Sequence, residues 1–292
     1  MLSEVSPSVD VDVWVNQVKA DPVAWRQRQA THILINAISL ASLIRGKIFL
    51  KGGILMGVAY NSLRQTTDVD FSTNLDASDA AVELIASQLR EALPRSAAQL
   101  GYADILVRLS SIKKLPRKNS FEKDSYPALK IRIAYARRGS PQERALTRLN
   151  PPDVVEVDIS FNEPLTDIHV IKLTDGEPLY VYGLIELMAE KYRAMFQQVS
   201  RDRIRRQDVY DLDFLIKMHP NLDEEFKITL LEIFQIKCRA RGIDPEIKLI
   251  EDPEVKKRSG ADWRTFEQEL DEVPNFDECY QRVSDFYRSL PW

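Results

Sequence analysis

The feature that most constrains the fold of this chain is Asp68-Val69-Asp70, two acidic residues separated by one apolar residue. Side chains of a β-strand alternate between its faces, so a strand here would carry both acids on one face, about 7 Å apart. Two carboxylates placed in this way repel each other unless a cation lies between them, and Mg²⁺ prefers carboxylate oxygens together with substrate phosphates. The motif therefore predicts a strand over about residues 67–72 that carries a metal-binding face.

A glycine turn precedes this acidic pair. The apolar run Ile48-Phe49-Leu50 predicts a strand over about 47–51 and leads into Lys51-Gly52-Gly53. Because glycine has no side chain, backbone N–H groups of the turn can approach phosphate oxygens. Taken alone, Asp-x-Asp is usually a solvated pair and Gly-Gly is usually only a turn. The two in this order are typical of a nucleotidyltransferase.

A third acidic residue lies on a later alternating segment. In the stretch 154–160, valines and Ile159 alternate with Glu156, Asp158 and Ser160, which predicts a strand over about 153–161. Two-metal phosphoryl transfer requires a carboxylate opposite the first pair. We assign this role to Asp158, with Glu156 as the alternative. The simpler interpretation is that these acids form the solvated face of a half-buried sheet.

Composition sets the class of protein. The chain has 292 residues, of which 44% are apolar and 29% are charged, and this favours two folded domains. The sequence contains no uninterrupted apolar run long enough to span a membrane. The start of the chain lacks the pattern of a signal peptide, and Cys238 and Cys279 have no metal-binding spacing, so we expect a reduced cytoplasmic protein.

The pattern along the chain predicts two domains. Two helices are expected over residues 11–45, a helix over 76–93 ending before Pro94, and further strands over 103–113 and 127–136. From residue 183 the pattern is almost entirely helical, with helices over 183–199, 206–218 and 222–241. We predict an α/β (α+β) domain over residues 1–172, with a mixed sheet and flanking helices, and a helical domain over 173–292.

The predicted helical domain carries charged residues at helical spacing. Glu186 and Glu190 share one face beside Lys191, and Asp208 and Asp211 share a face of the next helix. One interpretation is a set of salt bridges between helices, which composition alone favours. The other is that Lys191 binds a triphosphate and is held by Asp208 or Asp211, because a point charge on a long side chain neutralises phosphate during transfer.

Taken together, these motifs resemble the AbiEii/AbiGii family of nucleotidyltransferase toxins, which belong to type IV toxin–antitoxin (abortive infection) systems and share the DNA polymerase β-like fold. The resemblance runs from about Lys51 to Leu215 and rests on Lys-Gly-Gly-x-x-Leu, Arg-x-Thr-x-Asp-x-Asp-Phe, Val-Asp-Ile-Ser, Glu-Lys-x-x-Ala and Arg-x-Asp-x-Tyr-Asp-Leu. The second glycine stands where many relatives have serine, and Ile54 replaces a small hydroxyl residue.

The resemblance implies roles for individual residues. The phosphate turn would be formed by Gly52 and Gly53, the metal ligands would be Asp68 and Asp70, beside the third ligand Asp158 that we assign from its strand, the triphosphate lysine would be Lys191, and the later acid would be Asp208 or Asp211. Thr66 would assist nucleotide binding. We also expect Lys51, Arg64, Arg205 and Arg206 to bind substrate.

The expected activity is transfer of a nucleoside monophosphate from an NTP to a hydroxyl, with Mg²⁺, or Mn²⁺ as the alternative, as cofactor. The resemblance implies an RNA acceptor, specifically the 3′ end of tRNA, and a cognate antitoxin that need not form a stable complex. The net charge of −4 leaves room for local basic segments at 113–118, 201–206 and 256–258. The alternatives are transfer to a small-molecule or protein hydroxyl and a non-catalytic nucleotide-binding protein.

Overall fold

The computed structural model describes residues 8–116, 121–146, 151–174, 176–270 and 272–292. The chain divides into two compact units. Unit 1 comprises Met1–Asn61, Thr66–Glu163 and Ile168–Val181, and unit 2 comprises Ser62–Gln65, Pro164–Asp167 and Tyr182–Trp292. In the described part of the chain, no helix is both long and apolar enough to cross a membrane.

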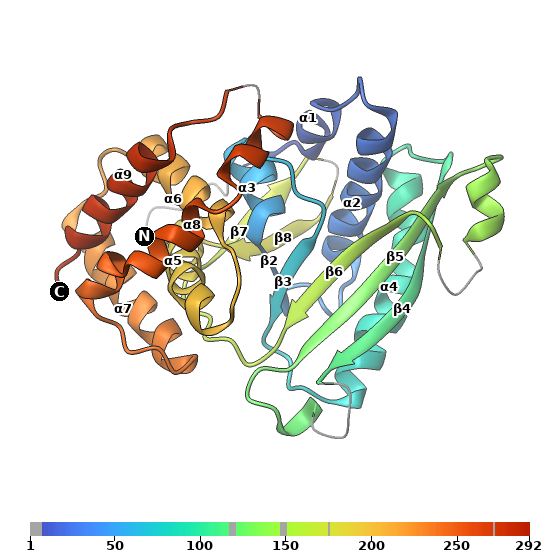
Figure 1. Ribbon diagram of the computed structural model, residues 1–292. Helices are drawn as coiled ribbons and strands as arrows, with labels where there is room; N and C mark the ends of the chain where they lie inside the picture. Colours follow the sequence, from blue (N-terminus) through green and yellow to red (C-terminus); the bar gives the residue numbers. More distant parts are fainter. Residues whose placement is uncertain (1–7, 117–120, 147–150, 175, 271) are drawn as a thin grey trace. The chain divides into compact units, whose positions relative to one another are not determined.

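Unit 1 is built on a mixed sheet (Figure 1). Its described strands follow the spatial order β1-β7-β8-β2-β3-β6-β5-β4. The strand bounds are β1 Ser8–Val9, β2 Ile48–Lys51, β3 Val69–Thr73, β4 Ile105–Leu115, β5 Ala128–Arg137, β6 Val154–Ser160, β7 Ile168–Leu173 and β8 Pro178–Tyr182. At the centre, β3 runs antiparallel to β2 and parallel to β6. This centre carries the residues discussed below.

Helices of unit 1 pack on the sheet and on one another. They are α1 Val11–Asn16, α2 Pro22–Leu40, α3 Gly52–Tyr60 and α4 Asp79–Gln99, with 3-10 turns at Phe121–Lys123 and Pro141–Ala145. Helix α2 packs on α4, and both contact the sheet (Figure 1). Side chains such as Phe71, Val157 and Ile159 are buried on this side. The opposite side of β3 and β6 is thereby left for polar residues.

Unit 2 is helical. Its helices are α5 Leu184–Ser200, α6 Arg206–Met218, α7 Glu224–Ala240, α8 Pro253–Gly260 and α9 Phe276–Arg288, with 3-10 turns at Ile247–Glu251 and Trp263–Gln268. Helix α5 packs against α6, α7 and α8. A cluster of aromatic rings, Tyr192, Phe196, Phe234 and Tyr287, forms part of its core with centroid separations between 5.1 and 6.4 Å.

The predicted fold class, a mixed α/β sheet with helices, is confirmed. The expected end of a helix before Pro94 is wrong, because α4 continues to Gln99. Proline removes one backbone hydrogen bond. Beyond it, however, Ser96 is buried and its hydroxyl donates to the carbonyl of Ile33 at 2.8 Å, which holds the last turns against α2. Tertiary packing outweighs the local helix-breaking signal.

Two features of domain organisation differ from expectation. The strands β7 and β8 were not predicted, and both extend the sheet, so residues 173–181 group with unit 1 and not with the predicted helical domain. The short segments Ser62–Gln65 and Pro164–Asp167 group with unit 2 although they lie within the predicted first domain. Of the basic segment 113–118, Arg117 and Lys118 lie outside the described residues.

Candidate active site

Three neighbouring strands bring polar residues together on one face of the sheet in unit 1. The register of β2, β3 and β6 aligns Lys51, Asp70 and Asp158. Adjacent strands lie about 4.8 Å apart, so Asp70 has a cationic residue on one side and an acidic residue on the other. The alternating neighbours Phe71 and Val157 are buried. The alternation predicted for residues 154–160 is therefore confirmed.

Asp68 lies just outside the strand that was predicted to contain it. Strand β3 begins at Val69, so the predicted start at residue 67 is wrong. Asp68 is exposed, and the hydroxyl of Thr67 donates to its Oδ1 atom at 3.3 Å. Thr66 is partly exposed two residues earlier. Ladder geometry therefore fixes Asp70 and leaves Asp68 free to adjust, which suits a ligand that closes around an ion.

The glycine turn lies directly against Asp70. Gly52 has a φ of +74°, and a Cβ atom on it would lie 2.5 Å from Oδ2 of Asp70. Any side chain at this position would therefore strain the backbone and strike the carboxylate. Gly52 and Gly53 begin α3, and Lys51 at the N-cap has no acceptor atom with which to cap it. Uncapped N–H groups at a helix start are suited to phosphate oxygens.

The third acid is perturbed by its surroundings. Partial burial raises the pKa of Asp158 above its ordinary value. Lys130, whose Nζ lies 3.6 Å from Oδ2 of Asp158, lowers this pKa, while the nearby charges of Asp68 and Glu156 raise it. Glu156, the alternative third acid, pairs with Arg132 at 3.5 Å. Since Asp158 and not Glu156 is in register with Asp70, the geometry favours Asp158.

The donor set fits a hard divalent cation in its chemistry, because Asp68, Asp70 and Asp158 offer only carboxylate oxygens. Among the described residues, no three His, Cys, Asp or Glu side chains converge closely enough to hold a metal ion by themselves. Mg²⁺ usually takes one or two carboxylates and completes its shell with water and substrate phosphates. Asp68 and Asp70 fit that pattern, and Asp158, one oxygen of which lies 3.6 Å from Nζ of Lys130, could supply a further carboxylate oxygen.

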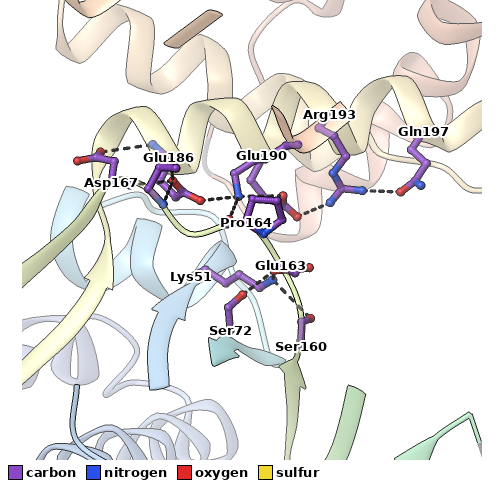
Figure 2. Close-up of polar contacts among 12 residues, drawn as sticks. Lys51, Ser72, Ser160, Glu163, Pro164, Asp167, Glu186, Glu190, Arg193 and Gln197 are labelled. Carbon is purple, nitrogen blue, oxygen red and sulfur yellow. Dashed lines mark hydrogen bonds and ion pairs between the residues drawn. The ribbon is translucent and has the colours of Figure 1, made fainter. Parts of the chain in front are cut away.

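A buried acid that the sequence did not indicate lies beside these residues. Glu163 accepts hydrogen bonds from the ammonium of Lys51 at 2.5 Å and from the hydroxyl of Ser72 at 2.6 Å (Figure 2). Lys51 also donates to Ser160 at 3.5 Å. Asn162, with a φ of +57°, turns the chain after β6 so that Glu163 can return to the sheet. Lys51, expected to bind substrate, is thus paired with a carboxylate that nothing in the local sequence pattern links to it.

In unit 2, Asp211 is the centre of an ion-pair cluster. Arg64 donates two parallel hydrogen bonds to its carboxylate, at 3.0 Å to Oδ1 and 3.1 Å to Oδ2. Lys191 donates to the same Oδ2 atom at 2.5 Å. Burial alone would raise the pKa of Asp211, but the charges and hydrogen bonds of Arg64 and Lys191 outweigh it, so this pKa is lowered. The sequence analysis expected Lys191 to be held by Asp208 or Asp211, and Lys191 is hydrogen-bonded to Asp211.

Asp208 lies one helical turn earlier and is treated differently. Oδ1 of Asp208 is 3.9 Å from Nζ of Lys191, and its Oδ2 is 3.9 Å from Nε of Arg205. These contacts are too long for hydrogen bonds. Burial raises the pKa of Asp208, and the nearby cations only partly offset it. Asp208 and Asp211 thus have pKa values that are displaced in opposite directions.

The acidic pair on α5 does not serve Lys191. Glu186 lies 2.5 Å from the buried ammonium of Lys237, and its other oxygen accepts from the backbone N–H groups of Thr166 and Asp167 (Figure 2). Glu190 pairs with Arg193 on its own helix. These contacts fasten the segment Pro164–Asp167 to the helices of unit 2, and they are structural ion pairs.

The arginine segment 201–206 contains two kinds of residue. Arg206 is engaged, because it donates to Glu269 at 2.9 Å and lies over the ring of Phe266. Arg201 and Arg203 are exposed. The pKa of Arg201 is lowered by partial burial and then by the charges of Arg241, Arg193, Arg203 and Arg205, which indicates a concentration of positive charge. Arg241 on the end of α7 was not anticipated as a member of this group.

A mixed sheet with acids on neighbouring strands and a glycine turn beside them is typical of a nucleotidyltransferase. The family model of the nucleotidyl transferase AbiEii toxin, of type IV toxin–antitoxin systems, matches residues 35–282, and the chain belongs to this family. No curated protein gave a significant match.

Solved structures support the fold. MenT4, a nucleotidyltransferase toxin from Mycobacterium tuberculosis H37Rv, is similar with a TM-score of 0.53 and 14% identity, covering 95% of this chain and 88% of that one. The protein JHP933 from Helicobacter pylori is similar with a TM-score of 0.50 and 14% identity, covering 90% of each chain. Sequence identities of 14% support a shared fold and nothing more specific. The predicted roles of individual site residues stay predictions.

Proposed function

We propose that this nucleotidyltransferase moves a nucleoside monophosphate from an NTP to a hydroxyl group of RNA, with Mg²⁺ as its cofactor and the 3′ end of tRNA as the acceptor. The observation that carries the proposal is the alignment of Asp70 with Asp158, with Gly52 held against the Asp70 carboxylate. This places carboxylates, a helix start and a close backbone approach at one point of the sheet. Each suits a triphosphate that is bound with a divalent cation.

In the proposed reaction, the acceptor oxygen forms a bond to the α-phosphorus and the bond from that phosphorus to the bridging oxygen breaks. Pyrophosphate leaves, and the hydroxyl proton is lost to solvent. The start of α3 would bind phosphate oxygens, and Lys191 would neutralise triphosphate charge. Asp68 and Asp70, joined by Asp158, would hold the cation, which when bound would offset negative charge that develops on the phosphates.

The basic group of unit 2 supports a polyanionic acceptor. Arg201, Arg203 and Arg205 follow one another between α5 and α6, and Arg241 acts on Arg201 electrostatically. Several cations at short range repel one another unless an anion is present, and nucleic-acid phosphates provide a regular series of anions. We assign the acceptor surface chiefly to the exposed Arg201 and Arg203, because Arg206 is paired with Glu269 and Arg205 lies 3.9 Å from Asp208.

The direct test is to incubate the protein with each labelled NTP, Mg²⁺ and total RNA and to look for a labelled RNA. We expect label in the size range of tRNA and none when Asp70 is replaced by Asn. Lys191→Ala should lower turnover by about 100-fold or more if it neutralises triphosphate charge. A Lys191→Ala protein with normal turnover and lower stability would return Lys191 to a purely structural role.

The acceptor is tested separately with purified tRNA whose 3′ terminal diol has been oxidised by periodate. Loss of labelling on oxidised tRNA, with full labelling on untreated tRNA, is the expected result. Labelling that persists would place the modified hydroxyl elsewhere in the RNA. If no RNA is labelled while pyrophosphate is still released in the presence of cell extract, a small-molecule or protein acceptor becomes the better interpretation.

A further inference from the structure

The acids of α6 differ in how completely they are bonded. Asp211 receives three hydrogen bonds from two cations, as described above. Asp213 accepts from Arg282 at 2.6 Å and from Cys279 at 3.4 Å, and Lys217 lies 2.7 Å away. Both are buried and both are satisfied by unit 2 itself, which is the ordinary condition of a buried carboxylate.

Asp208 is the exception. Only 5% of the residue is exposed, yet its Oδ2 atom is buried and has no hydrogen-bond partner among the described residues. The two nearest cations, Lys191 and Arg205, stand 3.9 Å from its oxygens. A buried carboxylate oxygen without a partner costs stability. Nothing in the fold of α6 requires that cost, since Asp211 and Asp213 avoid it on the same helix.

We propose that Asp211 and Asp208 have separate roles: Asp211 is a positioning residue that fixes Arg64 and Lys191, and Oδ2 of Asp208 is an acceptor for a hydroxyl group of the bound nucleotide or of the RNA acceptor. This inference rests on the proposed function and names a residue of unit 2 that would contact its substrates. A ribose hydroxyl would donate one hydrogen bond to this buried oxygen without bringing a further charge.

The positioning role follows from what Asp211 holds. Arg64 belongs to Ser62–Gln65, the segment of unit 2 that leads directly into Thr66 and the first metal acid. Arg64 and Lys191 donate to the same oxygen of Asp211, so this one carboxylate holds both the end of that segment and the lysine assigned to the triphosphate. The raised pKa of Asp208 and the lowered pKa of Asp211 agree with this division.

The test compares Asp208→Asn, Asp211→Asn and Asp213→Asn for thermal unfolding and for steady-state transfer. Asp208→Asn should leave Tm unchanged or higher while kcat/KM falls by about 10- to 100-fold, the value of a lost hydrogen bond to a charged group. Asp211→Asn should lower Tm by about 6 °C or more, because it strips two buried cations of their partner. Asp213→Asn is the matched control: Tm falls, and kcat/KM at a temperature well below unfolding stays as in the wild type.

Substrate analogues identify the hydroxyl. Wild-type protein should lose rate with a 2′-deoxy NTP, a 3′-deoxy NTP or an acceptor that ends in a 2′-deoxy residue, and Asp208→Asn should be insensitive to the one analogue that removes its partner. The wild-type protein also tests the proposed function. If the wild type transfers nothing from any NTP, the proposed function is refuted, whatever the variants do. The division of roles is overturned if Asp208→Asn transfers normally, if it loses Tm as Asp211→Asn does, or if every analogue affects it as much as the wild type.

Discussion

Replacing Gly52 by Ala tests whether the glycine turn and Asp70 form one site. The substitution adds a Cβ atom to a residue with a φ of +74°, which costs about 1–2 kcal/mol for an L-residue. The same atom would lie 2.5 Å from Oδ2 of Asp70 and 3.1 Å from its Cβ. Ordinary contact requires roughly 3.5 Å, so the carboxylate must move by about 1 Å. A displacement of that size at a reacting centre costs about 100-fold in rate.

Gly101 supplies the matched control, because it has the same φ of +74° and no atom within 4 Å of the position that its Cβ would take. Both alanine variants should lose about 1–2 kcal/mol of stability from backbone strain, which corresponds to a fall in Tm of about 2–8 °C. Only Gly52→Ala should lose about 100-fold in kcat/KM. Thermal unfolding and labelled-NTP transfer measure the two quantities. Equal activity in the two folded variants would refute the placement of Asp70 at the reacting centre.

Four further predictions follow from individual contacts. Asp70→Asn should abolish transfer and leave Tm equal or slightly higher, because a like-charge neighbourhood is relieved, and chelation of divalent cations should abolish wild-type transfer in the same assay. Glu163→Gln should lower the free energy of unfolding in urea by about 3 kcal/mol, because it breaks the buried pair with Lys51; a change below about 0.5 kcal/mol would contradict the pairing. Arg201→Gln with Arg203→Gln should flatten the logarithmic dependence of RNA affinity on salt by about two units without changing NTP affinity; an unchanged slope would remove these arginines from the acceptor surface. The negative charge of Asp208 costs stability at neutral pH, and Asp208 is neutralised as the pH falls through its raised pKa. The Tm of Asp208→Asn should therefore exceed that of the wild type by more at about pH 7 than at about pH 5. The reverse order would contradict the direction of the pKa shift.

Local patterns predicted the central part of the sheet and most helices because the relevant signals are local. Alternation over residues 154–160 specifies β6 and the side on which Asp158 lies, and helical spacing specifies α6 with Asp208 and Asp211 on one face. Helix α4 begins at Asp79, three residues later than expected, where Ser78 caps it with a hydroxyl that accepts from the N–H of Ala81. Each of these signals lies within a few consecutive residues of a single helix or strand.

The pairings within the site were not predictable from those patterns. Arg64 meets Asp211 across 147 residues, and Lys51 meets Glu163 across 112. No periodicity within a helix or strand encodes which distant carboxylate a cation will reach, because that depends on how the chain returns after each element. The strands β7 and β8 escaped prediction for a related reason, since short strands of five and six residues draw their stability from neighbours in the sheet.

The pairings change which cation is available to a triphosphate. Arg64 is bound to Asp211 through two parallel hydrogen bonds, and releasing it would leave a buried carboxylate with little compensation. Lys191 has a single hydrogen bond to the same carboxylate, so Arg64 still neutralises Asp211 when Lys191 turns toward another anion. Lys51 is bound to Glu163 at 2.5 Å and to Ser160 at 3.5 Å, so turning toward a phosphate would break a contact with each of these two residues. We therefore infer that Lys191 is the cation a phosphate recruits at the least cost, and that Arg64 and Lys51 act mainly by holding the chain on either side of the acids.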